Sequence, residues 1–283
     1  MEEMRHMGLF YNYNKPGKGV EKDAPKKKGI FLYFELFFRK FFKICTSSML
    51  YFLFSIPNLI ITFFMVAYIF GGVFSKLIPD PTGLMSITAL TVILFVVLWG
   101  TGPASAAYAY ILRSFAREEH TWIWSDFIKI YKENLKQSLV VMVLDYAVMF
   151  ISTTAIFFYA NLYMTESNVM WLVLAYFCFM IFLIYTFVHF YVYNLMVTFK
   201  CTIKELFRNS FMLAIGKSPM NLILAIFIGF VILLMFSTFR IGFSLFLLFI
   251  GFFGFLRFPI EFYVTRVVQK LTVTVKEDNN GEV

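Results

Sequence analysis

The chain has 283 residues, of which 60% are apolar and only 15% charged, and its mean hydropathy is +0.75. Soluble globular chains carry about a quarter charged residues, so this composition excludes an ordinary soluble domain. The net charge of +8 does not indicate nucleic-acid binding, because the basic residues lie in short segments between long apolar runs. Orientation of a membrane protein explains that distribution better.

The N-terminal part divides into two segments. Residues 1–28 are polar and basic, which predicts an irregular cytoplasmic segment. The aromatic stretch 31–43 carries Glu35 and Arg39 at the favourable i, i+4 spacing of a helix. It is too short and too charged to span a bilayer, so we expect an interfacial helix, with Arg39 and Lys40 among its anchors.

Six apolar runs follow, and they predict an all-α bundle with six membrane spans within a membrane domain at residues 29–270, followed by a polar cytoplasmic tail at 271–283. The runs lie at about 44–70, 84–112, 138–162, 169–199, 220–237 and 241–268. Pro57 and Pro103 lie inside apolar runs, where proline kinks a helix or starts a new one.

The distribution of Lys and Arg predicts the orientation. Of the 25 basic residues, 22 fall in segments on one side of the six runs, and only Lys76 and Arg240 fall on the other. The excess of basic residues on the cytoplasmic side predicts a multi-pass protein of the bacterial plasma membrane with both termini in the cytoplasm.

A second surface helix is predicted between the second and third runs. Ser125 followed by Asp126 is typical of a helix start, and charged residues fill the side opposite an apolar stripe. Trp122 and Trp124 precede this helix, and we expect them to anchor it at the membrane interface.

Three cytoplasmic segments resemble one another, around Glu35, Asp126 and Glu205. Thr202 and Glu205 have capping-box spacing. The ends of the even-numbered runs also match, each around one tyrosine: Tyr108, Tyr191 and Tyr263. The pattern predicts three units, each an interfacial helix followed by a helical hairpin; chance similarity between aromatic-rich segments is the alternative.

The ionisable residues inside the runs are the candidate site. Asp145 and Arg257 are expected about 12 and 13 Å from the same membrane edge, at a rise of 1.5 Å per residue. Buried charges usually face a partner or a wet cavity. We therefore predict a structural Asp145–Arg257 ion pair; the alternatives are Arg257 paired with Glu261, or a polar solute or proton site that includes His189.

No sequence pattern indicates catalysis. Nucleotide-binding, hydrolase and zinc motifs are absent, and the three histidines are scattered, so neither a catalytic residue, a cofactor nor a metal site is expected. Tyr108, Tyr191 and Tyr263 are candidates for lining a cavity, although tyrosines of an interfacial belt follow the same pattern.

Two stretches carry a resemblance to a known family: PKKKGIFLYFELFFRKFFKI and GPASAAYAYILRSFAREEHTWIWSDFIKIYKENLKQS. They resemble the YesL-like integral membrane proteins of bacteria, mainly Firmicutes, a family with a domain of unknown function. Genes of this family often neighbour sugar ABC importers. The resemblance implies a non-enzymatic accessory or regulatory role in carbohydrate uptake, with the lipid bilayer and ABC permease subunits as partners and no nucleic acid. The alternative is an autonomous small-solute transporter.

Overall fold

The computed structural model describes residues 29–73, 81–100, 102–238, 251 and 253–281. This part of the chain is all-α and contains ten helices. They are α1 (Ile30–Arg39), α2 (Phe41–Val73), α3 (Pro81–Leu98), α4 (Pro103–Ala116), α5 (Ile123–Glu133), α6 (Leu135–Glu166), α7 (Val169–Thr198), α8 (Ile203–Gly216), α9 (Ser218–Thr238) and α11 (Phe253–Gly281).

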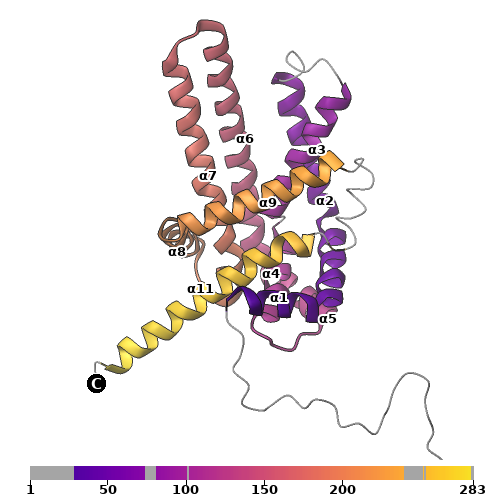
Figure 1. Ribbon diagram of the computed structural model, residues 1–283, viewed down its shortest axis with the longest axis vertical. Helices are drawn as coiled ribbons and strands as arrows, with labels where there is room; N and C mark the ends of the chain where they lie inside the picture. Colours follow the sequence, from indigo (N-terminus) through magenta and orange to yellow (C-terminus); the bar gives the residue numbers. More distant parts are fainter. Residues whose placement is uncertain (1–28, 74–80, 101, 239–250, 252, 282–283) are drawn as a thin grey trace, which may run out of the picture.

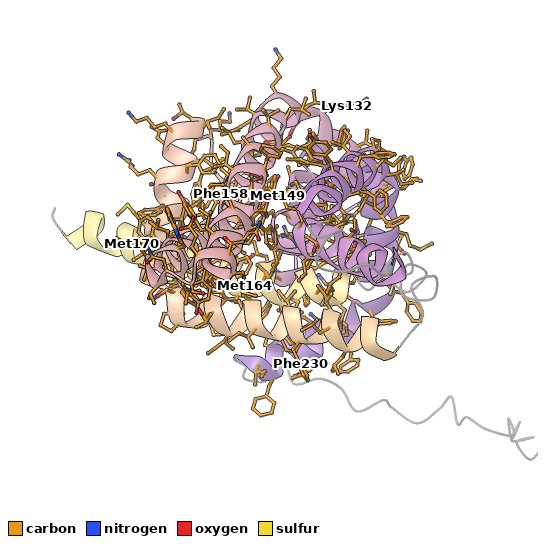
Figure 2. The ribbon with its side chains drawn as sticks, turned by 90° about the horizontal axis from the view of Figure 1, so that it is seen from above. Lys132, Met149, Phe158, Met164, Met170 and Phe230 are labelled. Atoms are coloured by element: carbon orange, nitrogen blue, oxygen red, sulfur yellow. The ribbon has the colours of Figure 1, made fainter. Side chains whose placement is uncertain are left out.

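The long helices form two neighbouring groups. Figure 1 shows the α6–α7 hairpin standing beside α2 and α3, with α1 and α5 at the end of the molecule opposite the α6–α7 turn. In contrast, α9 and α11 run obliquely across these helices. Seen from above, Met164 and Met170 mark the nearly end-on α6–α7 hairpin, whereas α9, labelled at Phe230, lies across the view (Figure 2).

The expectation of six spans is corrected to three to five candidate spans among the described residues. Only α2, over Phe41–Ile69, α6 and α7 are individually long and apolar enough to cross a membrane. Two further spans result only if each bent helix pair counts as one. The pair α3–α4 bends by 58°, and the pair α8–α9 by 89°.

In its described part, the sixth predicted run does not form a helix that is long and apolar enough to cross a membrane. Residues 239–250 and 252 lie outside the described residues, and α11 starts at Phe253. The first 18 residues of α11 carry four charges, at Arg257, Glu261, Arg266 and Lys270. That density of charge is costly in a bilayer core.

The three short helices share one local structure. Each of α1, α5 and α8 is followed, after a single residue, by a long helix. The linking residues are Lys40, Asn134 and Lys217, with φ, ψ of −106°, 13°; −98°, 6°; and −121°, 20°. Each backbone N–H donates to the carbonyl four residues earlier, at 2.9 to 3.1 Å. A short helix therefore precedes a long one at each of the three places, while the three predicted hairpin units stay a prediction because the third includes residues outside the described ranges.

Local sequence signals fix two of the helix starts. Thr202 is the N-cap of α8 and forms the complete capping box with Glu205. Pro103 is the first residue of α4, as its fixed φ and missing N–H favour. The predicted N-cap at Ser125 is wrong: the N-cap of α5 is Trp122, three residues earlier, and the Asp126 carboxylate accepts from the Trp122 N–H at 2.9 Å.

The core centres on α4. Every residue of α4 is buried except Tyr110, which is half-buried. Its alanines let neighbouring backbones approach closely, as small residues do between membrane helices. α4, α7 and α11 pack against one another in all three combinations. The helices that carry the three matching tyrosines therefore meet at the centre of the molecule.

Candidate functional site: a broken helix held by buried polar side chains

The break between α3 and α4 is the centre of the candidate site. α3 ends at Leu98 and α4 begins at Pro103. Gly100 and Gly102 have φ of 97° and 69°, values that glycine adopts without the strain a side chain would cause. A helix that stops leaves its last carbonyl groups without internal donors. In an apolar environment each of these carbonyls requires another partner.

Side chains from α7 and α11 supply those partners. Arg257 Nη1 donates to Val97 O at 2.9 Å and lies 3.4 Å from Leu98 O. His189 Nδ1 lies 3.0 Å from Trp99 O. On the other side of the break, the Gly102 N–H donates to the Tyr193 hydroxyl at 3.2 Å. The break is thus stabilised by ionisable and polar groups that are remote in sequence.

The first buried cluster, the acid–histidine cluster, consists of Asp145, Tyr185 and His189. Tyr185 donates its hydroxyl hydrogen to Asp145 Oδ1 at 2.8 Å, and His189 Nε2 lies 2.7 Å from the same oxygen. Despite this short distance, Nε2 has no aligned hydrogen bond. Asp145 and His189 are 2% and 0% exposed.

The indole of Trp99, just after the end of α3, packs against the acid–histidine cluster. Its ring stacks on the His189 ring, with centroids 5.5 Å apart and planes 14° from parallel. Its Nε1 donates to Thr186 Oγ1 at 2.9 Å. Trp99 therefore contacts His189 through both its ring and its backbone carbonyl, which couples the histidine to the break.

The second buried cluster, the arginine–glutamate cluster, consists of Arg257, Glu261, Asn194 and Thr265. Arg257 Nη2 lies 3.6 Å from Glu261 Oε1, one helical turn along α11. Asn194 Nδ2 donates to Glu261 Oε2 at 2.9 Å and to Thr265 Oγ1 at 3.1 Å. Glu261 Oε1 has no hydrogen-bond partner, so its charge is balanced mainly by Arg257.

The predicted ion pair between Asp145 and Arg257 is wrong. Asp145 contacts His189 and Tyr185, whereas Arg257 contacts Glu261, which was the predicted alternative. The depths of Asp145 and Arg257 along the membrane normal were estimated from the sequence. Depth alone does not determine which sides of two helices pack against each other. The structure nevertheless brings all four candidates to the same place, because Arg257 and His189 bind consecutive parts of the α3–α4 break.

The three matching tyrosines do not form one group. Tyr108 is hydrogen-bonded to Ser48 at 2.8 Å and stacks on Tyr51. Tyr191 donates to Asn221 Oδ1 at 2.8 Å, whereas Tyr263 is half-buried on α11. These contacts place the tyrosines between packed helices.

The predicted interfacial anchors lie away from the break. Trp122 and Trp124 are 72% and 63% exposed. Arg39 pairs with Glu35 and Glu118, and Lys40 Nζ donates to Phe115 O at 3.3 Å. Burial, followed by the nearby Arg39 and Lys43, lowers the pKa of Lys40. These contacts attach α1 to the C-terminal end of α4.

Sequence reasoning missed four residues of the centre: Trp99, Tyr185, Asn194 and Thr265. Asn194 had a usable signal, since an amide inside an apolar run needs a partner. Trp99 directly precedes Gly-Thr-Gly-Pro, a combination that favours a helix break. Within the described ranges, no three His, Cys, Asp or Glu side chains come together in a way that would hold a metal ion.

Comparison with known proteins finds a family match for part of the chain. Neither the curated proteins nor the solved structures contain a match to the chain. One family model matches a segment that runs from α2 into α6. This segment contains the α3–α4 break and Asp145, whereas His189, Arg257 and Glu261 follow it in the chain. Residues 44–156 match the family described as "Protein of unknown function, DUF624".

Proposed function

We propose that the protein is a non-enzymatic, YesL-like membrane protein that assists or regulates carbohydrate uptake through an ABC-type permease. The DUF624 match supports a membrane protein of this kind, and the resemblance to the YesL-like proteins supports the link to sugar import. One structural observation favours an accessory role. Each ionisable group at the centre, Asp145, His189, Arg257 and Glu261, is at most 2% exposed and contacts another protein group. Such a closed centre suits a scaffold better than a permeation path.

Co-purification tests the accessory role. The tagged full-length protein, expressed in its own host and extracted in mild detergent, should retain a sugar permease subunit through purification. The control is the same protein with Trp122 and Trp124 both changed to Ala, which leaves the polar centre intact. The proposal would be contradicted if no permease subunit is recovered. It would also be contradicted if a deletion strain takes up every sugar as well as the parent strain does.

A second function, an autonomous small-solute transporter, is favoured by the α3–α4 break. In many secondary transporters, discontinuous helices place their free backbone groups at a binding site. Here the break lies beside Arg257 and His189. Saturable uptake by proteoliposomes that contain only this protein would support transport and overturn the accessory role. Arg257→Gln should then abolish uptake, while Arg39→Gln, at an exposed ion pair, should leave it unchanged.

A further inference from the structure

We propose that Asp145 and His189 form a proton-binding site, which holds one proton more than a neutral imidazole and a carboxylate together possess. This inference is independent of the carbohydrate role. It rests on which atoms in the acid–histidine cluster can donate a hydrogen bond and which can only accept.

The first step concerns His189 Nδ1. Its partner at 3.0 Å is the carbonyl oxygen of Trp99, which can only accept. Nδ1 therefore carries a hydrogen and donates it. In a neutral imidazole only one of the two ring nitrogens carries hydrogen, so Nε2 would then present a lone pair.

The second step concerns the oxygen that Nε2 meets. Nε2 lies 2.7 Å from Asp145 Oδ1, and an ionised carboxylate can only accept. Two acceptors at this distance repel unless a proton lies on one of them. Tyr185 does not relieve this conflict, because its single hydroxyl hydrogen is already donated to Oδ1. One further proton is required, either on Nε2 or on the carboxylate.

The third step concerns net charge. Without the extra proton, the pair carries one negative charge in a site that is at most 2% exposed. With the proton, the pair is either an imidazolium beside a carboxylate or two neutral groups, and its net charge is zero. An unbalanced buried charge is far costlier than a balanced pair, so burial favours the protonated form.

The other titratable groups around the pair do not remove the need for this proton. They are Tyr146 on α6, Tyr185 and Tyr193 on α7, Tyr51 on α2, and Arg257 with Glu261 on α11. The tyrosines are neutral, and the Arg257 charge is directed to Glu261 and to the Val97 carbonyl. The Trp99 ring, stacked on His189 at 5.5 Å, favours a cationic imidazole through its π face.

The proton is linked to the break by geometry. His189 bonds the Trp99 carbonyl with Nδ1 and faces Asp145 with Nε2. When the proton leaves for solvent, Nε2 and the carboxylate oxygen are two acceptors 2.7 Å apart, and the ring is driven away from Asp145. The hydrogen bond between His189 Nδ1 and the Trp99 carbonyl at the end of α3 is then broken. Proton binding therefore favours the observed arrangement of the α3–α4 break.

Nuclear magnetic resonance of the full-length protein in detergent tests the site directly. The chain has three histidines, so ¹⁵N-histidine labelling gives a small set of ring signals, and His189→Gln identifies those of His189. At about pH 7.5, where an unperturbed imidazole is mostly neutral, His189 should show hydrogen on both ring nitrogens. In Asp145→Asn, the asparagine amide can donate to Nε2, so the hydrogen on Nε2 should be lost.

Each outcome decides the question. A neutral His189 ring, together with an infrared carboxylic-acid band that is absent from Asp145→Asn, would place the same proton on Oδ1 and also support the site. A neutral ring without such a band would overturn it. If Asp145→Asn fails to fold, Tyr185→Phe serves as the second variant: it leaves both acceptors in place, so the extra proton should remain. Loss of the proton in Tyr185→Phe would contradict the assignment.

Discussion

The two buried clusters solve the same problem with different connections. In the arginine–glutamate cluster, Arg257 and Glu261 are neighbours on one turn of α11. In the acid–histidine cluster, Asp145 and His189 come from two helices, α6 and α7. Both clusters bind the free end of α3, through the carbonyls of Val97 and Trp99. The comparison teaches that a local pair and a remote pair together stabilise one helix break.

The largest expected effect is from Arg257→Gln. It removes the donor to two α3 carbonyls and leaves the buried Glu261 carboxylate without its cation. Breaking a buried ion pair costs about 3–5 kcal/mol, so the free energy of unfolding in detergent should fall by that amount. The matched control, Arg39→Gln at an exposed pair, should cost about 1 kcal/mol or less. Similar losses from both variants would mean that the arginine–glutamate cluster does not hold the break.

Asp145→Asn should cost less than Arg257→Gln. The asparagine still accepts from Tyr185 and can donate to His189, so a loss of about 1–3 kcal/mol is expected. Because Asp145 and Arg257 do not contact each other, neither single loss should be rescued in the double variant. A double-mutant cycle measured by thermal unfolding checks this. If each substitution instead reduced the loss caused by the other, this would indicate the Asp145–Arg257 ion pair that the sequence predicted.

Tyr193→Phe tests the α4 side of the break. It removes the hydroxyl that accepts from the Gly102 N–H, one uncharged hydrogen bond. The expected loss in the free energy of unfolding is about 1 kcal/mol. Tyr110→Phe, on a half-buried position of α4, is the control and should change stability less. A larger loss than in Asp145→Asn would show that the break depends more on α7's hydroxyl than on the acid–histidine cluster.

The smallest effect concerns a local pair at the surface, the capping box of α8. The backbone N–H of Thr202, and then its hydroxyl, hold the pKa of Glu205 below its ordinary value. The capping contribution is therefore present above the ordinary carboxyl pKa and is lost as the pH falls through the lowered value. Thr202→Ala should raise the pKa of Glu205 toward the ordinary value, as measured by ¹³C chemical shifts. An unchanged pKa would show that the hydroxyl contributes nothing.

Features that depend on neighbouring residues could be predicted from the sequence. The apolar runs indicated an all-α, multi-pass protein, and the three long spans α2, α6 and α7 lie where they were expected. The capping box at Thr202 and the helix start at Pro103 were also predictable. Both depend on contacts within a few residues, which the chain specifies wherever the helix lies.

The partners of the buried charges were decided by the tertiary structure. Sequence spacing gave the depths of Asp145 and Arg257, but depth is only one of three coordinates. The rotation and neighbours of each helix fix the other two, and these follow from packing along the whole helix length. The helix break shows the same limit. Arg257 lies 160 residues from the Val97 carbonyl that it binds. The sequence determined that these polar groups needed partners, and only the packing of α3, α6, α7 and α11 determined which partners they have.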